Sequence, residues 1–77
     1  MLITQTKETK ICTFTQKGTK INFLTRRNFF DDEKYYDDYL VLLNRKQKYN
    51  GMSEIDARKI FAHLVQYYVL QLNLSVL

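Results

Sequence analysis

Cys12 and His63, the only cysteine and the only histidine of the chain, could in principle form a nucleophile and its base. The apolar alternation around Cys12 predicts a packing role on one face of a β-ribbon. His63 falls on the polar stripe of a predicted helix. Asp37 and Asp38 are adjacent in sequence and have no spaced acid partner for proton transfer. We therefore expect no catalytic residues and no enzyme.

The sequence also contains few residues that could bind a metal ion or a cofactor. A tetrahedral metal site needs about four ligands, which one Cys and one distant His do not supply. A single cysteine cannot form an internal disulfide. Gly18 and Gly51 are the only glycines, so no phosphate-cradling loop is present. The sequence predicts no metal, no cofactor and no small-molecule substrate, and it favours binding of another macromolecule.

An acidic, aromatic segment offers a first binding surface. Residues 31–38 carry five acids and one base, with tyrosines between them. They have two explanations: acids stabilising a helix N-terminus, or a surface for a basic protein partner. The residues predicted to bind a protein are Phe29, Phe30, Asp31, Asp32, Tyr35, Asp38, Tyr68 and Leu72.

A basic N-terminal half offers a second surface. Residues 1–30 carry six bases and one acid, and the whole chain has a net charge of +4. Lysines on edge strands prevent aggregation, but the same side chains can contact phosphates. The candidate nucleic-acid contacts are Lys17, Lys20, Asn22, Arg26 and Arg27.

The elements that position these residues begin with a β-hairpin. All seven threonines lie within the first 25 residues, and a Lys17-Gly18 turn separates two alternating segments. Only an even register leaves one apolar and one polar face. Residues 2–7 are a candidate third, edge strand. The pairs that this register predicts are Phe14 with Ile21, Cys12 with Phe23, Thr15 with Lys20 and Thr13 with Asn22.

Two helices are predicted to follow. The first runs from about residue 31 to residue 48, with acids in its first turn and bases in its last. Asn50-Gly51 would end it. Ser53 would cap a second helix, with Asp56 three residues on, and this helix would reach about Leu72.

The second helix also predicts association. From Leu64 onward its apolar arc is too wide for a surface helix of a small monomer. A chain of this length buries only about 60% of its unfolded surface, so it gains much from a partner. We expect a homodimer or a docked subunit.

The predicted fold class is α+β, an N-terminal antiparallel β-hairpin (with an optional third strand) packed on two antiparallel α-helices. Residues 1–77 form a single domain, with the ribbon at about 2–26 and the helices at about 31–48 and 53–72. No run of about 18 apolar residues and no apolar leader are present, so a cytoplasmic protein without membrane contact is expected.

The predicted function is a small non-enzymatic binding module, most simply a protein-interaction regulator or inhibitor. Abundant Lys, Asn, Ile, Tyr and Phe suggest an AT-rich genome such as that of a phage or mobile element. The alternative is a basic, dimeric DNA-binding regulator. The order of strand, helix and a helix opening with Gly51-Met52-Ser53-Glu54 is loosely similar to ribbon-helix-helix repressors, over about residues 19–72. That family uses one strand per chain, whereas this sequence predicts a hairpin. The resemblance implies that Lys20, Asn22 and Leu24 face DNA.

Overall fold

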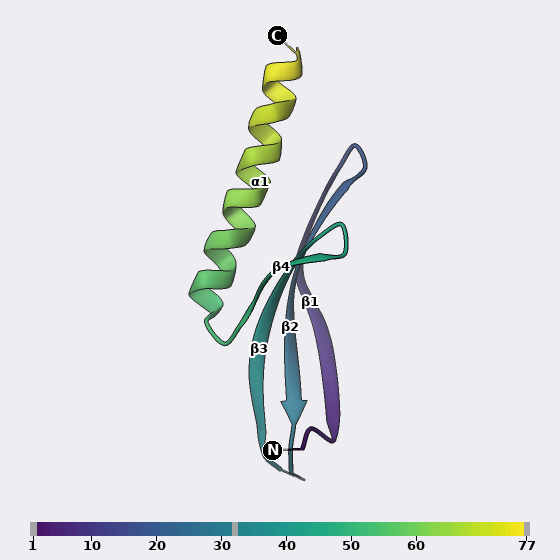
Figure 1. Cartoon of the computed structure of the whole chain (residues 1–77), viewed down its shortest axis with the longest axis vertical. Helices are drawn as coiled ribbons and strands as arrows, with labels where there is room; N and C mark the ends of the chain where they lie inside the picture. Colours follow the sequence, from purple (N-terminus) through teal and green to yellow (C-terminus); the bar gives the residue numbers. More distant parts are fainter. Residues whose placement is uncertain (1, 32, 77) are drawn as a thin grey trace.

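Four strands and one helix follow one another along the chain (Figure 1). The computed structural model describes residues 2–31 and 33–76, with side chains described as far as residue 71. The strands form one antiparallel sheet in the order β1-β2-β3-β4. The elements are β1 (Gln5–Gln16), β2 (Thr19–Phe29), β3 (Tyr35–Leu43), β4 (Lys46–Gly51) and α1 (Glu54–Val76).

The register predicted for the N-terminal hairpin is confirmed. Phe14 pairs with Ile21 and Cys12 with Phe23, because alternation of apolar and polar side chains favours one register over its neighbours. The register shifts between Lys10 and Cys12, where a β-bulge kinks β1. The proposed third strand is wrong, since residues 5–7 continue β1 opposite the end of β2.

The predicted helix over residues 31–48 is also wrong. The fold is a four-stranded antiparallel sheet with a single C-terminal helix, and residues 35–51 form β3 and β4. The ribbon-helix-helix layout fails with it, because that layout requires a helix directly after the ribbon. The stretch from Tyr35 to Leu43 is rich in tyrosine, valine and leucine, and tyrosine and valine favour strands.

The charge pattern that suggested a helix has a different cause. Asp38 lies opposite Arg26 and Asp37 lies opposite Arg27 in the β2–β3 register. The carboxylates are therefore stabilised by arginines of the neighbouring strand and not by a helix dipole. These pairs join residues that are 10 and 12 positions apart on different strands, so a helical pattern in the segment 31–48 does not reveal them.

Both outer hairpins turn on two residues with positive φ. Lys17 and Gly18 have φ of 42° and 82°, and Asn44 and Arg45 have φ of 50° and 79°. Two-residue hairpin loops favour this geometry because its twist matches that of the strands.

The C-terminal helix begins as the sequence predicts. The Ser53 hydroxyl accepts a hydrogen bond from the Asp56 backbone N–H at 3.1 Å, which caps the helix. Gly51, which we predicted to end a helix, instead ends β4. A Cβ there would lie 2.5 Å from the Tyr49 hydroxyl oxygen, so glycine leaves room for that ring.

Helix α1 packs on one face of the sheet, named here the helix-side face. The buried cluster between helix and sheet consists of Ile21, Phe23 and Val41 from the sheet and Ala57 from α1. Leu24 and Leu40, a cross-strand pair that faces away from α1, are buried as well. The opposite face, named here the open face, carries the alternate residues of each strand and is covered by no other element of the described chain. In Figure 1 α1 and the β1–β2 hairpin diverge upward from this core, while the lower parts of β1, β2 and β3 extend below the helix.

Candidate functional site

The C-terminal half of α1 presents an uncharged outer surface, on which large apolar side chains alternate with the exposed polar residues His63, Gln66 and Gln71. Residues 60–77 contain no Asp, Glu, Lys or Arg. Tyr67 and Leu70 are 55% and 54% exposed, and Val69 is 39% exposed. The C-terminal part of α1 extends away from the sheet (Figure 1), and Leu64 packs against the core cluster. Large exposed apolar side chains without charged neighbours are typical of an interaction surface.

The two outer hairpin loops form a basic region. The segments 10–25 and 39–53 contain six bases and no acid. The Asn44 N–H donates to the Lys20 carbonyl oxygen at 2.8 Å, and the Lys20 N–H donates to Asn44 Oδ1 at 2.8 Å. These bonds hold the base of one hairpin loop against the other. The bases at or near these two turns are Lys17, Lys20, Arg45, Lys46 and Lys48, and Lys10 lies further along β1.

A hollow of about 470 Å³ lies between these loops. Lys20 and Arg45 contribute cationic groups to its lining, and Asn22 and Asn44 contribute amides. Among the described residues, the side chains of Lys20 and Arg45 take part in no ion pair. Two free cations beside two amides can bind an anion through charge-assisted hydrogen bonds.

A polar network is buried on the open face. Arg26 donates to both carboxylate oxygens of Asp38, at 3.1 and 2.7 Å, and reaches Asn50 on β4 at 3.4 Å. Asn28 donates to the same carboxylate at 3.2 Å. The hydrogen bond from Arg26 lowers the pKa of Asp38 below its usual range, against the opposing effect of burial. The same bond raises the pKa of Arg26.

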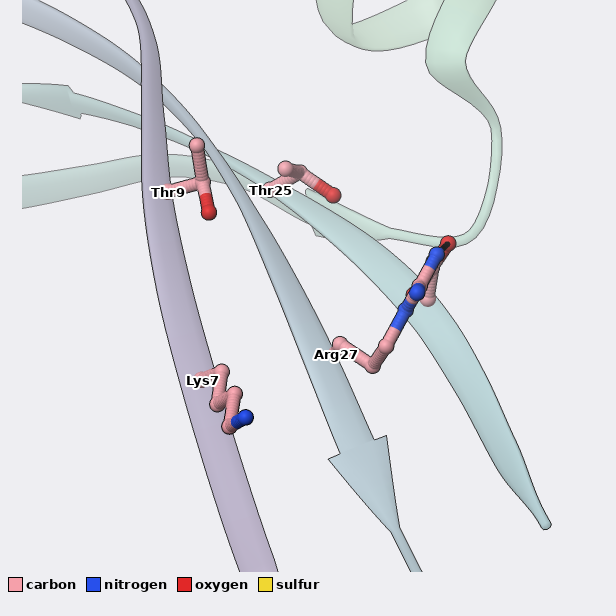
Figure 2. Close-up of a pocket in the computed structure, with 5 residues that line it drawn as sticks. Lys7, Thr9, Thr25 and Arg27 are labelled. Carbon is pink, nitrogen blue, oxygen red and sulfur yellow. Dashed lines mark hydrogen bonds and ion pairs between the residues drawn. The ribbon is translucent and has the colours of Figure 1, made fainter. Parts of the chain in front are cut away.

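A second cross-strand pair lies one row away on the helix-side face. Arg27 extends from β2 towards β3 (Figure 2) and donates to Asp37 at 3.0 and 3.2 Å. Its guanidinium carbon also lies 4.0 Å from the Tyr35 ring centre. Together with Lys7, Arg27 lines a hollow of about 300 Å³ on the part of the sheet below the helix. The hydrogen bond that Arg27 donates to Asp37 raises the pKa of Arg27.

These contacts divide the predicted nucleic-acid residues into two groups. Arg26 and Arg27 are engaged by carboxylates, so their charge is already neutralised. Lys17 and Lys20 remain free at the loop end among the described residues. Asn22 accepts a hydrogen bond from the Thr13 hydroxyl at 2.9 Å on the open face, as the hairpin register requires.

The predicted protein-binding residues do not form one surface. Phe29 pairs with Tyr35 on the helix-side face, with ring centres 5.7 Å apart. Phe30 pairs with Tyr36 on the open face, at 6.4 Å. Asp38 is only 8% exposed and holds Arg26 in place.

The remaining members of that prediction are scattered. Asp31 lies in the β2–β3 connection, and Asp32 lies outside the described residues. Tyr68 is partly buried against the core. Leu72 belongs to α1, but its side chain is not among those described.

Cys12 and His63 line different hollows. Cys12 faces the same side as Phe23, as predicted, but it is exposed and not packed in the core. It borders a hollow of about 290 Å³ with Phe61. His63 lies on the outer side of α1 beside Leu70.

The bases of the β3–β4 hairpin were missed as functional residues. Arg45, Lys46 and Lys48 were interpreted as the basic end of a helix, yet they lie on the β3–β4 hairpin, where Arg45 lines the same hollow as Lys20. The signal that could have revealed them is Asn44, since asparagine tolerates positive φ and is favoured in tight hairpin turns.

Within residues 2–31 and 33–76, α1 is not apolar enough over sufficient length to span a membrane. In the same part of the chain, the histidine, cysteine and acidic side chains form no group of three or more suited to hold a metal ion.

Comparison with protein-family models, with curated protein sequences and with solved structures finds no match to this chain.

Proposed function

We propose that this chain is a small non-enzymatic binding module that self-associates through the C-terminal half of α1. The observation that carries the proposal is the uncharged, exposed outer surface around Tyr67 and Leu70. Full burial of one such side chain contributes about 1.5 to 3 kcal/mol. A helix that leaves this surface in water therefore has a strong driving force to cover it.

A second copy of the chain fits this surface better than a foreign protein does. The surface carries no formal charge, so it offers no charge pattern by which one partner could be selected over another. Two copies related by a two-fold axis present the same apolar side chains to each other without like-charge repulsion. The buried cores of homodimer interfaces are also the most apolar of protein interfaces.

Sedimentation velocity at low micromolar concentration tests the proposal. The wild-type chain should sediment with twice the mass of one chain. Replacing Tyr67 and Leu70 together by Gln should give a monomer, because each change removes apolar contact from both halves of a symmetric interface. With about 1.5 kcal/mol for each lost side chain, the dissociation constant rises by at least a hundredfold.

Ile55→Gln is the matched control. Ile55 is 67% exposed on the same helix, near its N-terminus where charged residues surround it. Gln is a good helix former, so all variants should keep α1. Ile55→Gln should remain dimeric. A wild-type monomer at these concentrations, or equal loss of dimer in the Ile55 control, would contradict the proposal.

A further inference from the structure

We infer that the two outer hairpin loops form a binding site for the phosphate backbone of a nucleic-acid duplex. The site is centred on the hollow lined by Lys20, Asn22, Asn44 and Arg45. Further cations lie at the adjoining turn and on the β3–β4 hairpin, namely Lys17, Lys46 and Lys48. It lies on a different part of the molecule from the α1 surface and does not depend on self-association.

The first argument is the separation of charge in space. The paired arginines Arg26, Arg27 and Arg58 are each bound to a carboxylate. The cations of the loops have no acid within their own segments, 10–25 and 39–53. The hydrogen bonds between Lys20 and Asn44 bring the two segments together. The remaining positive charge of the chain is therefore concentrated at this end.

The second argument comes from the turn residues. Two-residue turns with positive φ favour Asn followed by Gly. The first loop has Lys17 before Gly18, and the second has Asn44 before Arg45. Each loop thus keeps one residue of the favoured pair and carries a base at the other position. Arg45, at φ 79°, adopts a conformation that is unfavourable for a residue with a Cβ. Lysine and arginine at two positions where glycine or asparagine would be less strained indicate that positive charge at the loop tips serves binding.

The third argument selects the ligand. Several cations spread over two loops match a repeating array of phosphates better than a single small anion. Proteins that bind single strands stack bases on aromatic rings, but on the open face beside the loops the alternate residues are polar or aliphatic. The residues of that area are Thr13, Thr15, Lys20, Asn22, Leu42, Asn44 and Gln47. A two-stranded β-ribbon also has dimensions that the major groove admits.

The test is a titration of fluorescently labelled DNA duplexes by anisotropy over a range of salt concentrations. Binding should have a dissociation constant on the order of 10⁻⁴ to 10⁻⁶ M at physiological salt, with little sequence preference. Each phosphate contact contributes about 0.9 to the slope of log K against log salt. The double variant Lys20→Gln/Arg45→Gln should therefore lower that slope by about 2.

The double variant Lys7→Gln/Lys34→Gln is the matched control. It removes the same net charge from the other end of the sheet, so its slope should stay within the error of the wild type. If both double variants lowered the salt slope equally, binding would depend on the overall charge of the chain, and the proposed site would be wrong. Equal competition by poly-glutamate of matched charge, or tighter binding of single-stranded DNA, would overturn the duplex as ligand. The monomeric Tyr67→Gln/Leu70→Gln chain should keep the slope per chain, which separates this inference from the proposed self-association.

Discussion

At the scale of single residues, two Arg–Asp pairs on opposite faces of the sheet differ in their burial and in their expected contribution to stability. Arg26–Asp38 and Arg27–Asp37 occupy consecutive rows of the β2–β3 ladder. The first carboxylate is nearly buried and is also bonded by Asn28, whereas the second pair faces solvent. Solvent screens an exposed ion pair, so we expect only the open-face pair to matter for folding.

Asp38→Ala should therefore destabilise the protein by about 2 to 3 kcal/mol, because it leaves Arg26 and Asn28 without their acceptor. Asp37→Ala is the internal control and should lower stability by no more than about 1 kcal/mol. Urea unfolding at neutral pH measures both. Equal effects of the two substitutions would show that burial does not distinguish the pairs.

The Asp38 effect should also depend on pH. In the folded protein the pKa of Asp38 is lower than its ordinary value of 3.8. The folded state therefore binds this proton less readily than the unfolded state does. The stabilisation is then complete above the unfolded pKa and is lost as pH falls through the lower folded pKa. The stability difference between wild type and Asp38→Ala should be constant from pH 7 to about 5 and should shrink below the unfolded pKa of about 3.9. A difference that persisted unchanged at pH 2 would contradict the assignment.

At the scale of the elements, the turn of the β3–β4 hairpin has a charged residue, Arg45, at a position whose backbone conformation favours glycine. The turn places Arg45 at φ 79°, where glycine is unstrained. The β1–β2 hairpin has the same turn geometry, but there glycine occupies the equivalent position, as Gly18. The β3–β4 loop thus retains a base at a position where it weakens the turn.

Arg45→Gly should raise the free energy of unfolding by about 0.5 to 1 kcal/mol while it weakens duplex binding. Arg45→Lys keeps both the charge and the Cβ, so it should change neither quantity appreciably. Thermal unfolding and the anisotropy titration measure the two effects on the same preparations. A destabilised Arg45→Gly chain would show that the arginine supports the turn through contacts, and a stabilised chain with unchanged binding would remove Arg45 from the site.

At the scale of the whole molecule, a small core holds together an elongated structure. The principal extents are 56 × 21 × 16 Å, and the core of Ile21, Phe23, Val41 and Ala57 lies where α1 crosses the sheet. The outer half of α1, the hairpin loops and the lower part of the sheet all project from this centre (Figure 1). Binding surfaces are thereby separated from one another and from the core.

This shape predicts uneven local stability along a single strand. Residues 26–29 of β2 lie in the part of the sheet that extends past α1, whereas residues 21–24 lie in the part on which α1 packs. Both segments are paired on each side, so the hydrogen-bonding pattern is matched. Hydrogen exchange should be at least tenfold faster for amides of the lower segment, because local opening exposes less apolar surface there. Uniform exchange along β2 would mean that the sheet opens only as a unit.

The sequence by itself determined the features whose causes are local. Alternation around Lys17-Gly18 determined the hairpin register, and Ser53 determined where the helix begins. The wide apolar arc of the helix from Leu64 onward indicated apolar side chains that the chain does not cover, and Tyr67, Val69 and Leu70 are exposed. Each of these depends on a signal carried by one segment of the sequence: a glycine turn between alternating strands, a capping serine or an apolar helical arc.

Only the tertiary structure decided the state of residues 31–48 and the location of the basic region. A segment with acids followed by bases is compatible both with a helix stabilised by its dipole and with a strand stabilised by cross-strand ion pairs. Arg26 and Arg27 on the neighbouring strand favour the strand, because they pair with Asp38 and Asp37. The same pairing brought Asn44 to Lys20, 24 residues away, and so joined two basic loops. A local pattern cannot reveal such contacts, because the free energy that selects them comes from side chains distant in the sequence.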